Sequence, residues 1–164
     1  MDKDNRQEII FLVTVAFLFW IFLVPAVRQA RLETRDTLRQ EHLTTLRAAI
    51  EKFGNDNVFY PTPAPNFLLC TTTHDKKSWF FGKQSPLLSA RYLEAIPHDV
   101  RESSRRTYTY CATDIRDDGA HGYYLESILE GDVIKEEPGF DFKLVPDDKR
   151  VIYRVCGGTA TECD

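Results

Sequence analysis

The side chains that most often perform catalysis are scattered along this sequence. Cys70 and His74 are the nearest cysteine and histidine, but sequence alone gives no geometry for a catalytic pair. Ser85 and Ser127 lie in no nucleophile elbow, and the chain has no phosphate-binding loop and no metalloprotease helix motif. The four histidines are His42, His74, His98 and His121. We therefore expect a protein that is not an enzyme.

A short acidic segment is the best candidate for a metal ion. "TDIRDDGAHG" contains Asp114, Asp117 and Asp118, whose carboxylates offer the hard oxygen atoms that calcium prefers. The spacing fits no EF-hand loop, however, and acidic turns are commonly just solvated. We expect no obligatory cofactor and keep calcium as the one metal to test.

The four cysteines are placed as in a disulfide-bonded domain. None forms a CxxC pair, and no cluster of cysteine and histidine has zinc-finger spacing. Scattered cysteines in a small domain suit an oxidising compartment, whereas four buried thiols in a cytosolic domain are the alternative. Three pairings are possible. We expect Cys156–Cys163, which closes a short glycine-containing loop, and Cys70–Cys111.

One long apolar run precedes all of these residues. From Ile9 to Val27 there is no ionisable side chain, and as a helix this stretch just spans a ~30 Å hydrocarbon core. A cleaved signal peptide has a shorter apolar core and a small-residue cleavage site, whereas Pro25 lies in the best candidate site here. We expect a retained single-pass anchor in residues 1–27 and one compact domain in residues 28–164.

The orientation of that anchor is contested. Two basic residues precede the run and four arginines follow it within twelve residues, so the positive-inside rule alone would put the domain in the cytoplasm. The predicted disulfides argue for the opposite side, and we expect a cytoplasmic N-terminus with the domain outside the cytoplasm. The formal net charge of −4 disfavours nucleic acid as the main partner.

A helical pattern continues beyond the apolar run. Apolar residues recur at mostly helical spacing up to Phe53, which predicts one helix over about residues 8–53. Pro25 should kink this helix rather than end it, and Gly54 is placed as its stop. Charged residues of alternating sign fill the other face, which we expect to be solvated. They are Glu33, Arg35, Asp36, Arg39, Glu41 and Arg47.

The rest of the chain predicts short strands and one short helix. "SPLLSARYLEAI" has the pattern of a helix with Ser85 as its N-cap and Pro97 as its end. Strand-like composition marks the segments "NFLLCTTT", "SWFFGK", "RTYTYCATDI", "YYLESILE", "DFKLV" and "RVIYRVC", with a turn at "DDGAHG". The expected fold class is α+β, with a long N-terminal helix, half in the membrane and half amphipathic, packed on a small antiparallel sheet.

Several segments resemble the superfamily of type IV pilins and type II secretion pseudopilins. "AIEKFGNDNVFYP" is similar to the family's helix exit, where Asn and Asp residues precede Tyr-Pro. "YLEAIPHD" resembles a segment of the major, G-like pseudopilins. The arginine-rich stretch before Ile50 is similar to the amphipathic helix pattern of the family. Family members also carry a glutamate at the start of the apolar helix and often a proline seventeen residues later. Glu8 and Pro25 have this spacing.

The resemblance implies a structural subunit of the bacterial inner membrane. Its domain would be periplasmic or extracellular, and its N-terminal helix would pack with copies of itself or other pilin-like subunits into a filament or secretion pseudopilus. Glu8 would meet the N-terminal amine of a neighbour, and Pro25 would aid local melting during assembly. By plainer physics, Glu8 complements the helix dipole and Pro25 is tolerated near the membrane edge. The family's calcium loop would correspond to Asp114, Asp117 and Asp118.

One departure from the family keeps a second function open. Prepilins carry a glycine just before their processing site, whereas no glycine precedes the apolar run here. Processing by a prepilin peptidase is therefore not expected from this sequence. The alternative function is a single-pass, membrane-anchored binding or sensor domain that forms no filament.

Overall fold

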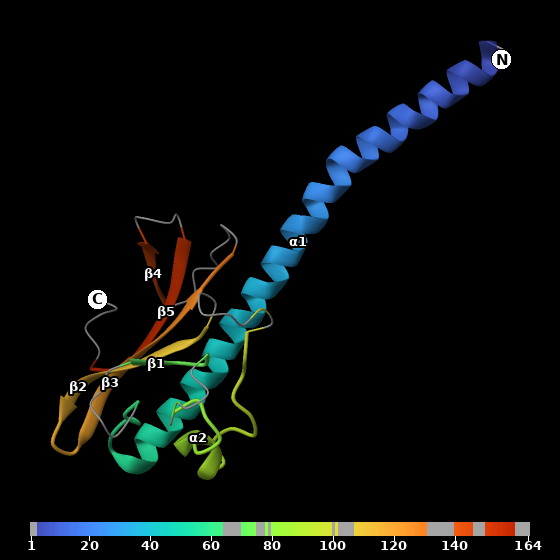
Figure 1. Ribbon diagram of the computed structural model, residues 1–164. Helices are drawn as coiled ribbons and strands as arrows, with labels where there is room; N and C mark the ends of the chain where they lie inside the picture. Colours follow the sequence, from blue (N-terminus) through green and yellow to red (C-terminus); the bar gives the residue numbers. More distant parts are fainter. Residues whose placement is uncertain are drawn as a thin grey trace.

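The protein consists of one very long helix and a small antiparallel sheet packed on its C-terminal half (Figure 1). The computed structural model describes residues 3–63, 70–74, 78, 80–99, 101, 107–130, 140–145 and 150–159. The elements are α1 (Lys3–Asn57), β1 (Cys70–Thr72), α2 (Pro86–Ser89), β2 (Thr109–Arg116), β3 (Gly119–Ile128), β4 (Phe140–Val145) and β5 (Arg150–Gly158). The expected α+β class is confirmed.

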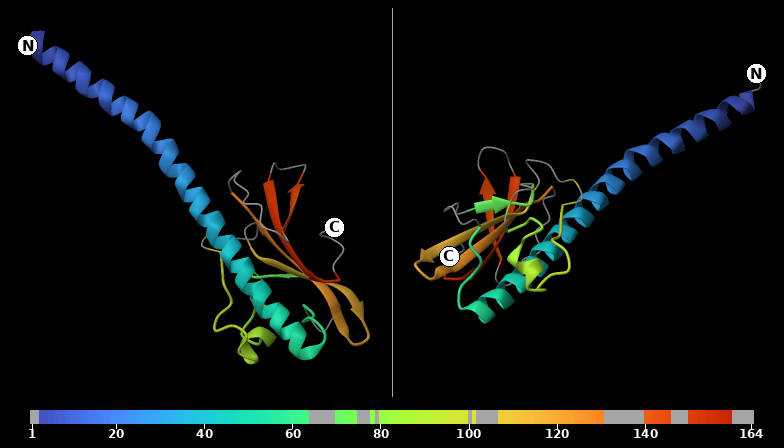
Figure 2. Two further views of the ribbon diagram at one scale, coloured as in Figure 1. Left: turned by 180° about the vertical axis from the view of Figure 1, so that it is seen from behind. Right: turned by 60° about the horizontal axis from the view of Figure 1, so that its bottom comes forward.

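The five strands form one sheet in the order β1-β2-β3-β5-β4, and every neighbouring pair is antiparallel. α1 lies across one face of this sheet, and its N-terminal half projects well beyond the domain (Figures 1 and 2). The strands expected in "RTYTYCATDI", "YYLESILE" and "RVIYRVC" are present as β2, β3 and β5. Along β3 burial alternates, because Tyr123 and Leu125 are fully buried and Tyr124 between them is partly exposed. The alternation predicted for the β2 segment is wrong, because the consecutive side chains of residues 110–112 are all buried.

The core lies between the C-terminal half of α1 and the sheet. Leu43, Leu46 and Ile50 are 0% exposed, as their helical spacing predicted. They pack in one cluster with tyrosines of three strands, Tyr110 and Tyr123 among them. Complete burial of a Leu or Ile side chain stabilises a fold by roughly 1.5–3 kcal/mol, so this stripe of α1 is a main source of the domain's stability.

The end of α1 differs from the prediction. Gly54 does not stop the helix, which continues to Asn57 and closes with a hydrogen bond from the Val58 amide to the Gly54 carbonyl (2.8 Å). The left-handed residue that follows the helix is Val58, with φ +70°. The glycine instead makes room for a ring, because a Cβ at position 54 would lie 2.6 Å from Cε1 of Tyr60. A glycine predicted to cap the helix is thus a glycine required by packing.

Two other expected elements are wrong. In the described part of "SWFFGK" the chain turns, because the Gly82 amide donates to the Ser78 carbonyl (2.7 Å), a hydrogen bond between residues four apart that an extended strand does not form. Phe80 and Phe81 within this turn are both buried in the core. The helix expected to run to Pro97 covers only Pro86–Ser89, although Ser85 does cap it by accepting from the Leu87 amide (3.3 Å).

Candidate functional site

The apolar half of α1 is exposed over its whole circumference. Its large apolar side chains from Ile9 to Val27 are 36–72% exposed, and no part of this segment is buried in the domain. Within the described residues, one helix is long and apolar enough to cross a membrane, and it lies near the N-terminus. An exposed run of this size is stable in lipid or against other protein, not in water.

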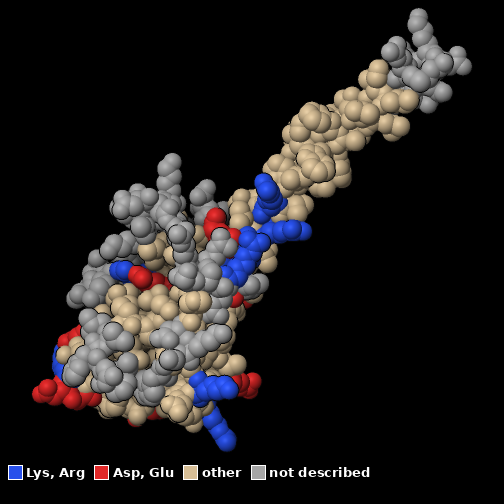
Figure 3. Space-filling view, in the orientation of Figure 1, with Lys and Arg blue, Asp and Glu red and all other residues tan. Residues whose placement is uncertain are grey.

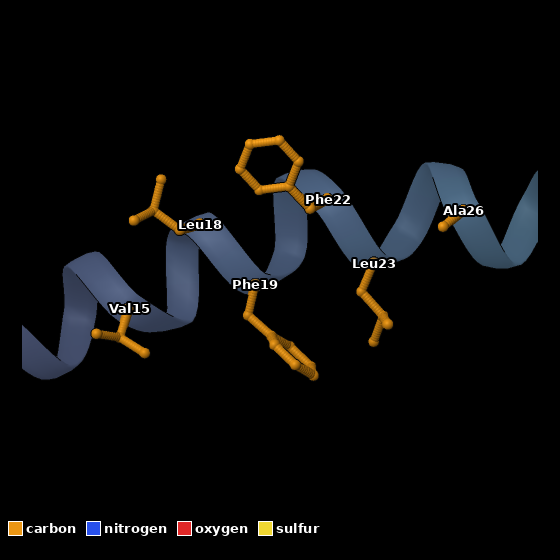
Figure 4. A pocket seen from close by; sticks show the side chains of 6 residues that line it. All are labelled: Val15, Leu18, Phe19, Phe22, Leu23 and Ala26. Atoms are coloured by element: carbon orange, nitrogen blue, oxygen red, sulfur yellow. The ribbon is translucent and has the colours of Figure 1, made fainter.

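A shallow apolar groove lies on the surface of this segment. It is lined by Val15, Leu18, Phe19, Phe22, Leu23 and Ala26. Leu18 and Phe22 project to one side of the helix and Phe19 and Leu23 to the other, with no polar side chain among the six (Figure 4). Ridges and grooves of this kind are the surfaces through which helices pack on one another.

The two predicted assembly residues lie in this half of α1. Glu8 belongs to the helix, but its side chain lies outside the described residues. Pro25 lies inside the helix and does not end it, as predicted. α1 bends within its N-terminal half in both ribbon figures (Figures 1 and 2), as expected where a proline removes a backbone donor.

Where the exposed half of α1 meets the domain, five charged side chains form a cluster that sequence reasoning missed. We call Arg35, Asp36, Arg39, Asp99 and Glu130 the ion cluster. Asp36 and Arg39 were expected on a solvated face, and that expectation is wrong because they are 4% and 2% exposed. The helix supplies three members, the loop after α2 supplies one, and the segment after β3 supplies one.

Arg39 is the centre of the ion cluster. Its guanidinium donates to Asp36 (2.7 Å), to both oxygens of Asp99 (2.5 and 3.2 Å) and to Glu130 (2.6 Å). Burial works to lower the pKa of Arg39, but the hydrogen bonds and charges of Asp99 and Glu130 outweigh it, so the net shift is upward. The guanidinium therefore stays charged at every physiological pH.

The other members of the ion cluster add further hydrogen bonds. Asp36 also accepts the backbone N–H of Glu130 (3.0 and 3.1 Å), and Arg35 donates to Glu130 (2.7 Å). Asp99 accepts the amide of Arg101 (2.7 Å). The cluster thus ties the helix to the sheet at the end of the domain nearest the apolar segment. Its role in this geometry is to fix the helix, since its carboxylates are occupied by fixed cations and amides.

A second polar contact fixes α1 farther along. The carboxylate of Glu51 accepts from the hydroxyls of Tyr60 (3.1 Å) and Tyr123 (2.9 Å). Burial first, and then the Glu51 charge, raises the pKa of Tyr60 to about 12 and moves that of Tyr123 in the same direction. Gly157 lies beside Glu51 and Tyr123, where a larger residue would collide with both. Both tyrosines remain neutral donors at neutral pH.

The predicted calcium residues do not converge. Asp114 accepts from Arg116 (2.7 Å) and Thr159 (2.7 Å), and Asp118 is paired with His121 (2.8 Å). Among the described residues, no group of three or more acidic, histidine or cysteine side chains lies close enough to hold a metal ion. Calcium at Asp114, Asp117 and Asp118 stays a prediction that this geometry does not support.

The cysteine prediction is confirmed where it can be followed. Cys70 and Cys111 form a disulfide and lie directly opposite each other in the β1–β2 ladder, with Cα atoms 4.0 Å apart. Cys156 is disulfide-bonded as well. Its expected partner, Cys163, lies outside the described residues.

The histidine nearest the core has a structural contact. Nδ1 of His42 lies 2.7 Å from the hydroxyl of Tyr108, a side chain that is 0% exposed. Burial lowers the pKa of His42, opposed by the charges of Asp99 and Glu41. The ring therefore favours its neutral form, which is able to exchange a hydrogen bond with a phenol.

No family model, characterised protein or solved structure matches this chain. The assignment of a function therefore rests on the exposed apolar helix and on the way it is joined to the domain.

Proposed function

We propose that this protein is a pilin-like structural subunit, anchored in the bacterial inner membrane and packed through its N-terminal helix into a filament or secretion pseudopilus. The observation that carries the proposal is the continuity of α1. One helix is apolar and exposed over Ile9–Val27, and the same helix contributes buried side chains to the core of the domain from Leu43 onward. A domain that only needs tethering requires no such stiff connection, whereas a subunit whose position must be defined by helix packing does.

The surface of the apolar segment supports packing between subunits. Its groove takes the ridge of a second apolar helix, and large aromatic side chains such as Phe19 and Phe22 offer area for burial. In a membrane these helices diffuse separately or pair through dispersion contacts. Outside the membrane, the same surfaces have to be covered by neighbours.

The disulfide supports a domain outside the cytoplasm. Cys70–Cys111 joins the edge strand β1 to the sheet, and such bonds persist in oxidising compartments. This argument opposes the arginines after the apolar segment, which by the positive-inside rule favour a cytoplasmic domain. We give the disulfide more weight because Arg35 and Arg39 are held in the ion cluster by carboxylates.

Crosslinking in membranes tests the function. Phe17 and Phe19 are 63% and 64% exposed and point to opposite sides of α1. A chain carrying both Phe17→Cys and Phe19→Cys should give a ladder of multimers on mild oxidation, whereas either single variant stops at dimers. Coexpression with excess unsubstituted chain should shorten the ladder.

The alternatives give other patterns. A membrane-anchored binding or sensor domain yields monomers, or dimers from the double variant, and this result would refute the filament. Orientation is measured separately with Thr44→Cys, an exposed position of α1 beside the domain. Labelling by an impermeant thiol reagent in spheroplasts, before lysis, supports a periplasmic domain. Labelling only after lysis overturns it.

A further inference from the structure

An apolar patch lies at the end of the domain farthest from the apolar segment. Outside residues 9–27, three large apolar side chains of the described chain are at least 36% exposed, and we call them the distal patch: Val58 (82%), Phe59 (36%) and Ile115 (39%). They belong to one end of the domain, where Phe59 lies against Gly119 and Ile115 is paired across the hairpin with Ala120, the next residue of β3. The tip of the β2–β3 hairpin and the end of α1 meet at this place (Figure 1).

Val58 in particular is not explained by the fold. It has φ +70°, a conformation that a β-branched residue adopts at a steric cost and that glycine or asparagine normally provides after a helix. Its side chain is 82% exposed, so it contributes little to the core. A strained residue that displays an apolar side chain to solvent is consistent with a contact surface.

The distal patch has acidic neighbours. They are Asp56 at the end of α1 and Asp114, Asp117 and Asp118 in the hairpin. Over residues 52–59 and 114–119 these four aspartates outnumber one lysine and one arginine, which gives a formal charge of −2. Asp56 accepts the hydroxyl of Tyr92 (2.7 Å), but neither Asp56 nor Asp117 forms an ion pair with a described residue, so both charges are available to a partner. Acidic side chains are visible at the hairpin tip (Figure 3).

The same chain carries a complementary surface. Arg28 and Arg31 follow the apolar segment directly, are exposed and form no ion pair with a described residue. Val24 and Val27 beside them are 36% and 41% exposed. We call these four residues the basic collar. Lys and Arg side chains gather where the apolar helix enters the domain (Figure 3).

The distal patch and the basic collar of one chain are too far apart to contact each other. Between Arg28 and Asn55 α1 is one unbroken helix, which at 1.5 Å per residue separates them by about 40 Å. The same distance keeps the distal patch away from the membrane that holds its own apolar segment. The occupant is therefore another protein with an apolar, positively charged surface, and the basic collar of a second copy has both properties.

We infer that the distal patch of one subunit docks the basic collar of a second copy that is displaced by about 40 Å along the helix axis. This inference rests on the proposed function, because two subunits that both remain in the membrane have their collars at the same height. The contact is heterologous, so its repetition builds an open chain of subunits rather than a closed dimer. Apolar contact supplies the area, and the opposite charges fix the register.

Paired cysteines test the contact in full-length protein in whole cells, which retain subunits displaced out of the membrane together with those still in it. Chains carrying Arg31→Cys and Asn55→Cys, coexpressed, should crosslink to each other at least fivefold more than Arg31→Cys with Thr44→Cys, whose position is exposed but lies midway along the helix. Asn55 is itself exposed beside the distal patch, and its substitution leaves the four aspartates in place. The native Cys70, Cys111 and Cys156 are disulfide-bonded and do not compete. Equal yields for the two pairs overturn the inference.

Val58→Gly separates docking from folding. Glycine removes the strain, so the temperature of unfolding should rise, whereas loss of the side chain should lower the 31–55 crosslink at least threefold. An unchanged crosslink means that the patch does not dock the collar. If the Phe17/Phe19 ladder forms and the 31–55 crosslink does not, the filament stands and this inference falls. If the 31–55 crosslink forms without the ladder, displaced subunits dock through this contact but do not pack through the faces that carry Phe17 and Phe19, and the packing of α1 in the proposed function is overturned.

Discussion

Substitution of Arg39 by methionine should cost far more stability than its place in a charged helical pattern suggests. Methionine keeps the aliphatic length of the side chain and removes the guanidinium. Three carboxylates then lose a cation while their side chains remain 2–10% exposed, namely Asp36, Asp99 and Glu130. Removal of one partner from a buried ion pair typically costs about 3–5 kcal/mol, because the remaining charge is left uncompensated.

The remaining hydrogen bonds place the expected loss at the lower end of that range. Asp99 keeps the Arg101 amide, Glu130 keeps Arg35, and Asp36 keeps a backbone amide. We therefore expect a loss of about 3 kcal/mol, a large part of the 5–15 kcal/mol that stabilises a typical domain. For a domain of this size that loss lowers the unfolding temperature by roughly 10 °C.

The assay is thermal and urea unfolding of the full chain in detergent micelles, followed by the near-ultraviolet circular dichroism of its buried tyrosines. Arg116→Met is the matched control. Arg116 also pairs with an aspartate, but it is 58% exposed, and such pairs contribute about 0–1 kcal/mol. In the variant with both Arg39→Met and Asp99→Asn, the loss should be smaller than the sum of the single losses, because one stranded charge is removed. Equal effects of Arg39→Met and Arg116→Met would refute the reasoning.

Three further outcomes are expected. Replacement of Cys70 and Cys111 by alanine should lower the free energy of unfolding by roughly 3–4 kcal/mol, as measured by urea unfolding, because the bond closes a loop with a sequence separation of 41 residues. The folded pKa of His42 lies below the unfolded value, so between the two values the unfolded chain binds more protons and stability falls as the pH drops below about 6.5. The variant His42→Asn, which preserves a polar partner for Tyr108, should flatten that slope in unfolding curves recorded from about pH 7.5 to 5. Four glycines inserted after Gln29 should leave the tyrosine circular dichroism unchanged, because burial begins at residue 36, and should abolish the crosslinking ladder.

The sequence was informative where a pattern is local. The positions of Leu43, Leu46 and Ile50 follow from a period of 3.6 residues, and burial against a sheet was the consequence. Ser85 was predicted to be the N-cap of a helix because a serine stands directly before a proline, and it does cap α2. The pairing of Cys70 with Cys111 was selected from three possibilities and is present.

The ion cluster escaped prediction because its partners are distant. Arg39 binds Asp99 and Glu130, which are 60 and 91 residues away, and nothing in the helix itself marks them as partners. Alternating charges along a helix have the same appearance whether they face solvent or a buried carboxylate. One signal was present in the segment: the arginine lies three residues after Asp36, on the same side of the helix as the apolar stripe at Leu43 and Leu46.

The two polar contacts of α1 determine what the exposed helix is able to do. The ion cluster holds it near residue 39 and the Glu51 carboxylate holds it twelve residues later, with the core side chains between them. Attachment at two separated points prevents both rotation and sliding of the helix against the sheet. A rotation of the apolar segment therefore turns the whole domain. In a tethered sensor this stiffness would be a constraint without a benefit. In a filament it converts the packing of apolar helices into a fixed position for every domain, which the docking of the distal patch on a second subunit's collar requires.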